Sequence, residues 1–174
     1  MWLGSRKRPA TKGVTEMARP EVGDTAPAFS AATQDEGVVV SLSDYAGKQA
    51  VVLYFYPKDD TPGCTTESCG FRDLTAEFAA AGAAIVGVSR DSSQSHARFV
   101  SKYGLGFPLL SDVDGAICEA YGVWVEKSNY GKKYMGIERT TFVIDAAGKV
   151  AAVFPKVKVD GHVGKVLEAV KALA

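Results

Sequence analysis

The sequence predicts an α/β fold with a central mixed β-sheet flanked by helices. Segments 50–56 and 83–89 are continuous apolar runs rich in β-branched residues, which is typical of strands buried on both faces of a sheet. Stretches with apolar residues at helical spacing follow both runs. Two further strand-like runs and a last helical pattern complete the chain, so strands and helices alternate as in an α/β domain.

The expected elements follow one another along the chain, and each is bounded by turn or capping residues. They are a strand at 38–40, a helical turn at 43–44, a strand at 50–56, a helix from 62 to 82, a strand at 83–89, a helix after 91–93, an edge strand at 107–110, a helix at 112–121, a hairpin of 140–145 and 149–154, and a final helix at 161–173. In the helix from 62 to 82, Pro62 suits the first turn, Phe71, Leu74 and Phe78 recur at helical spacing, and Gly82 closes the segment.

Composition limits the class of protein. The chain has 174 residues, and we expect one domain over 20–174 after a poorly ordered tail at 1–19. For the first sixteen residues, an upstream start with Met17 as the natural one and a weakly targeting-like segment are the alternatives. Basic and acidic residues balance at 20 each, which predicts neither nucleic-acid nor membrane-surface binding. No apolar stretch approaches the roughly 20 residues that span a bilayer.

Three cysteines make an odd count, which does not suggest the disulfide framework of a secreted protein and fits the reducing cytoplasm. The most informative of them is Cys64, which follows a Thr-Pro-Gly turn where a strand hands over to a helix. Unpaired backbone N–H groups and the helix dipole favour a thiolate at that place. A buried apolar cysteine is the alternative, but the polar loop before it argues against burial of that kind. The pattern predicts a thiolate nucleophile, with Cys69 five residues on.

These residues resemble the peroxiredoxins, thiol enzymes on a thioredoxin-like fold. The family pattern is a proline, three residues, a threonine or serine, two residues and the peroxide-attacking cysteine, which here reads Pro57, Thr61 and Cys64. The wording Tyr-Pro-Lys-Asp-Asp-Thr-Pro-Gly-Cys, with a second cysteine after four residues, is similar to the peroxiredoxin Q or bacterioferritin comigratory protein subgroup. Arg139, at the start of a late strand, matches the arginine of the family. The resemblance runs from about residue 20 to the C-terminus.

The resemblance implies a mechanism for reducing hydrogen peroxide and organic hydroperoxides. Cys64 becomes a sulfenic acid, Arg139 and Thr61 stabilise the developing charge, and Pro57, Thr61 and Arg139 form the peroxide site. Cys69 then condenses with the sulfenic acid, and thioredoxin restores the dithiol. No metal, haem or flavin is implied, and the subgroup points to a monomer.

The role of Cys69 has two interpretations. On a straight helix, Cα atoms five residues apart lie roughly 8–9 Å from each other, beyond the limit of about 7 Å for a disulfide. Cys69 is therefore either simply packed, or it resolves oxidised Cys64 after the first turns of the helix unwind. Gly63 and Gly70 lower the helix stability of this segment, which suits local unwinding.

Other candidates keep their alternatives. Thr61 could instead be a helix N-cap, and Arg139 a solvated charge at a strand end. Glu67 either orients Arg139 or is an exposed helix charge. Cys118 is expected to be a structural core thiol, with a resolving role as the minor alternative. The two histidines, His96 and His162, have no local pattern that indicates a Cys–His dyad or a zinc site.

Two other functions use the same cysteine pair. A thiol–disulfide oxidoreductase normally carries Cys-x-x-Cys, which the spacing here does not match. A redox sensor would turn over slowly and without a recycling partner.

Overall fold

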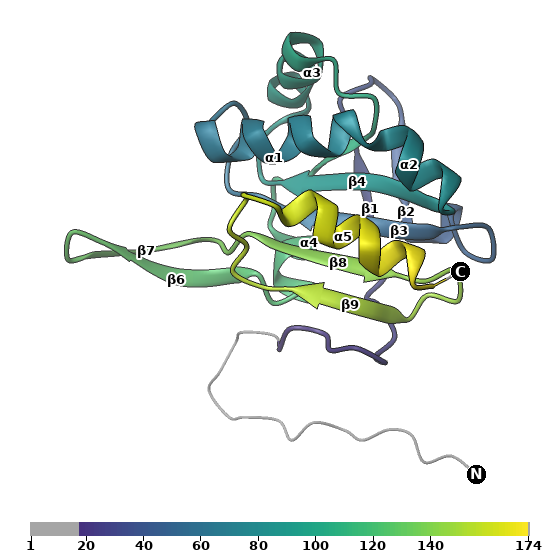
Figure 1. The fold of residues 1–174 in the computed structure, drawn as a ribbon. Helices are drawn as coiled ribbons and strands as arrows, with labels where there is room; N and C mark the ends of the chain where they lie inside the picture. The colour runs from purple at the N-terminus through teal and green to yellow at the C-terminus, as the bar shows by residue number, and fades with distance from the viewer. Residues whose placement is uncertain (1–17, 174) are drawn as a thin grey trace.

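A five-stranded mixed sheet with the order β5-β4-β3-β8-β9 forms the centre of the computed structural model, which describes residues 18–173 (Figure 1). Its strands are β3 (Ala50–Phe55), β4 (Ala83–Ser89), β5 (Leu109–Ser111), β8 (Thr140–Ile144) and β9 (Val150–Phe154). Strands β3, β4 and β5 are parallel, whereas β8 is antiparallel to both of its neighbours. The predicted mixed sheet, with β5 at its edge and β8–β9 as a hairpin, is confirmed.

Helices cover both faces of this sheet. One core joins β3 to α1 (Pro62–Asp73), α2 (Thr75–Ala80), α3 (Ser93–Tyr103) and α5 (His162–Lys171), and the other joins it to α4 (Ala116–Ala120). Alternate side chains of β3 enter the two cores, because successive residues of a strand point to opposite faces. Tyr54 faces α1, and Phe55 faces the side of α4. This double burial explains why the strand reads as a continuous apolar run.

The expected single helix from 62 to 82 is wrong, because it breaks at Leu74. That residue has φ −107° and ψ 12°, so α1 ends there and α2 starts anew. The hydroxyl of Thr75 donates to the carbonyl groups of Phe71 and Arg72 at 3.0 and 2.9 Å, in addition to the N–H of Leu74, which donates to the same two carbonyl groups. The apolar spacing continues across the break, and therefore the spacing alone could not reveal it.

Two further elements follow the expectation closely, and a third begins later than expected. The strand expected at 38–40 is β2 (Val39–Ser41), which pairs with β1 (Ser30–Ala32) in a separate two-stranded sheet. The short helix η1 (Leu42–Asp44) follows it, as the helical turn predicted there. The helix expected at 112–121 begins only at Ala116, because the Asp112 carboxylate accepts the N–H groups that start α4.

A hairpin that the sequence analysis did not predict projects from the body of the protein (Figure 1). It consists of β6 (Trp124–Asn129) and β7 (Lys132–Ile137). Its two turn residues, Tyr130 and Gly131, both have positive φ, 51° and 81°, as a type I′ turn requires. A Tyr-Gly pair between two polar segments is a weak turn signal, and neither strand is apolar enough to be recognised alone.

The tail that we expected to be poorly ordered comprises residues 1–19. Residues 1–17 lie outside the described residues. Within the remaining two residues, Arg19 donates a hydrogen bond to Glu138 at 3.2 Å. The division into a tail and a domain stays a prediction. Among the described residues, no helix combines the length and apolar character needed to cross a membrane.

Candidate active site

Cys64 lies in the first turn of α1, directly after β3 and the loop 57–61. The side chain is 1% exposed. Pro62 opens the helix, where a missing N–H costs nothing, and Thr65 is the first residue to donate to a helix carbonyl, that of Thr61 at 2.8 Å. The N–H groups of the first turn therefore have no helical partners, and Cys64 lies at the positive end of the helix dipole.

Arg139 reaches this thiol from the residue before β8. Its Nη2 donates to the Sγ of Cys64 at 3.3 Å, and its Nη1 donates to the Oε1 of Glu67 at 2.7 Å. The guanidinium thus bridges a thiol and a carboxylate that lie one helical turn apart. Gly63 makes room for it, because a Cβ there would lie 3.1 Å from Nη2.

Glu67 is fully buried, so its interpretation as an exposed helix charge is wrong. Burial raises the pKa of Glu67 to about 7, while the charge and hydrogen bond of Arg139 act in the opposite direction. The carboxylate holds Arg139 in place from beneath and leaves the second guanidinium nitrogen directed at the thiol.

His162, the first residue of α5, completes this layer. Its Nε2 lies 3.6 Å from the Oε2 of Glu67 and 2.9 Å from the Oγ1 of Thr141. Burial, Arg139 and Lys165 lower the pKa of His162 to about 4, so the ring is neutral at pH 7. Sequence reasoning missed this residue, since no local pattern connects the start of α5 with α1.

The stability of the folded chain is expected to depend on Glu67 and His162 in opposite directions. The raised pKa of Glu67 gives a contribution that is fully present below pH 4.5 and is lost as pH rises to about 7. The lowered pKa of His162 gives one that is present above pH 6.5 and is lost as pH falls to about 4. In the wild type the two slopes offset each other.

Glu67→Gln removes the first slope and keeps an oxygen for Arg139. We expect its free energy of unfolding, measured with urea, to rise by on the order of 1–3 kcal/mol between pH 4.5 and 6.5. His162→Gln is the matched control and should show the reverse, a free energy that falls as pH rises. Flat profiles in both variants would contradict the assignment.

Thr61 stands at the N-cap position of α1, but its side chain makes no capping hydrogen bond. Its hydroxyl donates to the carbonyl of Lys58 at 2.9 Å. Because the hydroxyl proton of Thr61 is used in this hydrogen bond, only the lone pairs of its oxygen remain, and these can accept a hydrogen bond. Pro57 is exposed and lines a groove of about 420 Å³ together with residues of the β6–β7 hairpin.

Lys127 lines the same groove and was not singled out from the sequence. Burial and the charge of Arg139 lower its pKa, and Cys64 acts in the opposite direction, which puts the ammonium within electrostatic reach of the site. The hairpin had to be recognised before this residue could be found.

Cys69 lies half-buried on α1, and all three cysteines are free thiols. With the helix intact, a bond to Cys64 is excluded by the spacing of the backbone. Unwinding would have to break the 2.8 Å contact between Tyr54 and Ser68 and the ion pair of Glu67. Gly70 has a packing role in addition to its low helix propensity, because a Cβ there would lie 3.0 Å from Val163.

Cys118 lies in the core beneath α4 and is 0% exposed. Burial, followed by the Asp112 carboxylate, raises the pKa of its thiol far above the usual range. The thiol therefore remains protonated, as expected of a structural cysteine.

The chain matches the AhpC/TSA family over residues 22–153. It is 58% identical over 147 residues to the putative peroxiredoxin bcp of Coxiella burnetii, and the match covers 84% of this chain and 96% of the relative. It is 49% identical over 154 residues to peroxiredoxin Bcp of Bacillus subtilis, covering 88% and 97%. Among solved structures, peroxiredoxin Q of Xanthomonas campestris superimposes with a TM-score of 0.79 at 49% identity, covering 84% of this chain and 92% of that one.

The family match includes β3, β4, β5, β8 and the Cys64 segment, and the solved structures agree with the thioredoxin-like fold that the sequence resemblance implied. The chain therefore belongs to the AhpC/TSA family and is a peroxiredoxin of the Bcp or peroxiredoxin Q kind, a thiol-dependent peroxidase.

Proposed function

We propose that Cys64 is the nucleophile of this peroxidase and that Arg139 is its electrostatic partner. The 3.3 Å contact between the guanidinium and the thiol, at the N-terminus of α1, carries the proposal. The thiolate attacks one oxygen of a hydroperoxide and the O–O bond breaks. Cys64 gains the hydroxyl as a sulfenic acid, and the other oxygen leaves as hydroxide or alkoxide and takes a proton from solvent.

Charge moves from sulfur to the leaving oxygen in this step. Arg139 remains positive throughout, since a guanidinium does not lose its proton in a protein. Thr61 accepts the hydrogen bond of the peroxide O–H, because its own proton is held by Lys58. Pro57 forms the outer wall of the peroxide site. Fixed groups of this kind stabilise a transition state without needing to reorganise.

Cys69 resolves the sulfenic acid in the second half of the cycle. Its thiolate attacks the Cys64 sulfur, the hydroxyl leaves as water, and a Cys64–Cys69 disulfide forms after α1 unwinds locally. A dithiol protein of the thioredoxin type then reduces the disulfide, and α1 reforms.

The substrates would be hydrogen peroxide and organic hydroperoxides. A bacterioferritin comigratory protein of Xanthomonas campestris, 48% identical, is described as having alkyl peroxide reduction activity. The chemistry needs no metal, haem or flavin. A cytoplasmic location and a monomeric state are part of the proposal, supported by the odd number of cysteines and by the subgroup.

A redox sensor, or a thiol–disulfide oxidoreductase, is the alternative function for the same cysteine pair. Peroxide consumption measured with thioredoxin and NADPH-linked recycling separates them. Sustained turnover supports the peroxidase cycle, and a single stoichiometric oxidation supports a sensor.

Cys69→Ser tests the resolving step. We expect the first oxidation of Cys64 to keep nearly the wild-type rate, disulfide formation to stop, and a sulfenic acid to accumulate, as seen by mass spectrometry after one equivalent of peroxide. In the wild type, hydrogen exchange over residues 61–71 should become faster on oxidation. Cys118→Ser is the matched control and should form the Cys64–Cys69 linkage normally. A Cys64–Cys118 linkage, or full recycling of Cys69→Ser, would move the resolving role elsewhere.

A further inference from the structure

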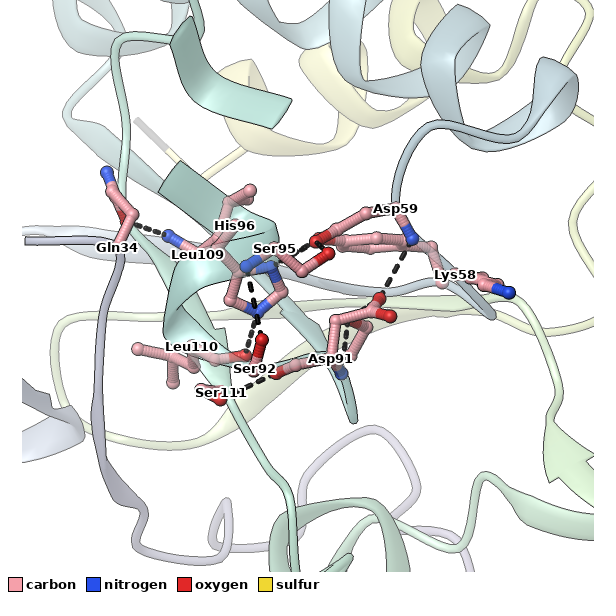
Figure 2. Close-up of polar contacts among 12 residues, drawn as sticks. Gln34, Lys58, Asp59, Asp91, Ser92, Ser95, His96, Leu109, Leu110 and Ser111 are labelled. Carbon is pink, nitrogen blue, oxygen red and sulfur yellow. Dashed lines mark hydrogen bonds and ion pairs between the residues drawn. The ribbon is translucent and has the colours of Figure 1, made fainter. Parts of the chain in front are cut away.

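A buried polar cluster lies behind the active-site loop and takes no part in the chemistry described above (Figure 2). Its centre is the carboxylate of Asp59, a buried loop residue. One oxygen accepts from the hydroxyl of Tyr56 at 2.6 Å, and the other accepts from Ser95 at 2.7 Å and faces the Nδ1 of His96 at 2.8 Å. The loop is thereby tied to the first turns of α3.

His96 is fully buried, and both of its ring nitrogens face oxygen atoms. The Nε2 lies 2.9 Å from the carbonyl of Leu110, which can only accept, so this nitrogen carries a proton. The Nδ1 faces the Asp59 carboxylate, so a second proton must lie between these two groups. Although burial raises the pKa of Asp59, the hydrogen bonds and charge around it outweigh burial and lower it. The ring of His96 is thus held between the β5 carbonyl of Leu110 and the Asp59 carboxylate of the loop.

The backbone of Asp59 is held as well. Its N–H donates to the Oδ2 of Asp91 at 2.8 Å, and the same oxygen accepts from Ser89 at 2.6 Å. This N–H belongs to the peptide unit whose carbonyl is that of Lys58. That carbonyl accepts the hydroxyl of Thr61. One rigid peptide plane therefore links the Asp91 carboxylate to the Thr61 side chain.

The next residue of the loop, Asp60, has φ +57°, which is uncommon outside glycine and needs support from its surroundings. Its carboxylate accepts from Lys102 and from Tyr103, both at 2.9 Å, at the end of α3. The two ends of α3 thus hold two consecutive loop residues, Asp59 through Ser95 and His96, and Asp60 through the last turn.

We propose that Asp91 and His96 are positioning residues for peroxide reduction. They hold the Lys58–Asp59 peptide in place. The Thr61 hydroxyl then donates its hydrogen bond to the Lys58 carbonyl and directs its lone pairs at the peroxide. The inference rests on the role proposed for Thr61. Because the clamp lies on the N-terminal side of Thr61, it stays formed while α1 unwinds, and the resolving step does not depend on it.

A double-mutant cycle tests the connection to Thr61. The second-order rate constant for oxidation of Cys64 by hydrogen peroxide is measured by stopped flow for Asp91→Ala and His96→Gln, with Thr61 present and with Thr61→Val. We expect each change to slow oxidation by about tenfold or more when Thr61 is present, since small misplacements of a reacting group are costly. With Thr61→Val, the further loss should be within about twofold, because the group being positioned is gone.

Two controls separate positioning from general loss of stability. Ser92→Ala removes the N-cap of α3, a 3.1 Å bond to the N–H of Ser95, without touching the loop, and should oxidise at the wild-type rate. Asp91→Asn retains an oxygen for the Asp59 N–H and should recover most of the rate that Asp91→Ala loses. If Asp91→Ala does not fold, Asp91→Asn takes its place in the double-mutant cycle. Disulfide formation after oxidation should stay within about twofold of wild type in every folded variant, as expected for steps that do not share the clamp.

Losses that are equal in the two Thr61 backgrounds would overturn the proposal, and so would a wild-type rate for both Asp91→Ala and His96→Gln. A wild-type rate for Thr61→Val alone would overturn the role of Thr61 and the clamp with it, but would leave Cys64 as the nucleophile.

Discussion

Replacement of Cys64 by serine is expected to abolish peroxide reduction. A serine hydroxyl stays protonated near neutral pH even beside Arg139 and a helix N-terminus, so no anionic nucleophile forms at this position. The two side chains differ by one atom, and the buried pocket can accept either. The measurement is peroxide consumption with a recycling thioredoxin, together with mass detection of oxidised protein.

Cys118→Ser makes the same exchange at a buried thiol whose raised pKa keeps it protonated. This matched control should retain the wild-type rate of peroxide reduction, although its folded state loses some stability. Substantial turnover by Cys64→Ser, or loss of turnover in a folded Cys118→Ser, would refute the assignment of the nucleophile.

Arg139→Gln should slow the oxidation of Cys64 by about 10²–10³, the usual cost of losing a charged or well-placed donor to a developing oxyanion. The variant loses the donor that lies 3.3 Å from the thiol, while glutamine keeps part of the packing. The rate constant is measured by stopped flow with hydrogen peroxide. Arg98→Gln removes the same charge at an exposed position of α3 and should react like wild type.

A second effect of Arg139→Gln must be separated from the first. In this variant Glu67 loses the arginine with which it forms an ion pair. Its buried charge then costs the folded state more free energy. Stability should therefore recover as pH falls and Glu67 takes up a proton, whereas the rate should stay low. A rate within a few fold of wild type, in a variant shown to be folded, would exclude Arg139 from the reaction.

The position of Cys64 at the start of a helix and the strands around it could be predicted because their signals are local. The run at 83–89 coincides with β4, and the run at 50–56 with β3 and one further residue. The Thr-Pro-Gly-Cys entry predicted a thiol in the first turn of a helix, which is where Cys64 lies. Turn residues and burial on both faces leave a mark in the neighbouring sequence, so a few residues are enough to recognise them.

Arg139 was singled out by resemblance to a family, and its distance from Cys64 came from the fold. The residues that surround its guanidinium, Glu67 and His162, could not be recognised from the neighbouring sequence. Glu67 looked equally suited to solvent, and His162 had no visible connection to α1, yet both are buried beneath the guanidinium. The break at Leu74 was equally hidden, because helical spacing continues through it.

By itself, then, the sequence determined the central strands of the α/β sheet and the thiol at the start of α1, because periodicity and capping depend on residues that are neighbours in the chain. Only the tertiary structure decided which charges are buried together. Burial raises the pKa of Glu67 and lowers that of His162, and it encloses Asp59 with His96, through contacts between segments 37 to 95 residues apart. These pKa shifts depend on the loss of solvent around the titratable groups, and that loss occurs only when the fold brings distant segments together.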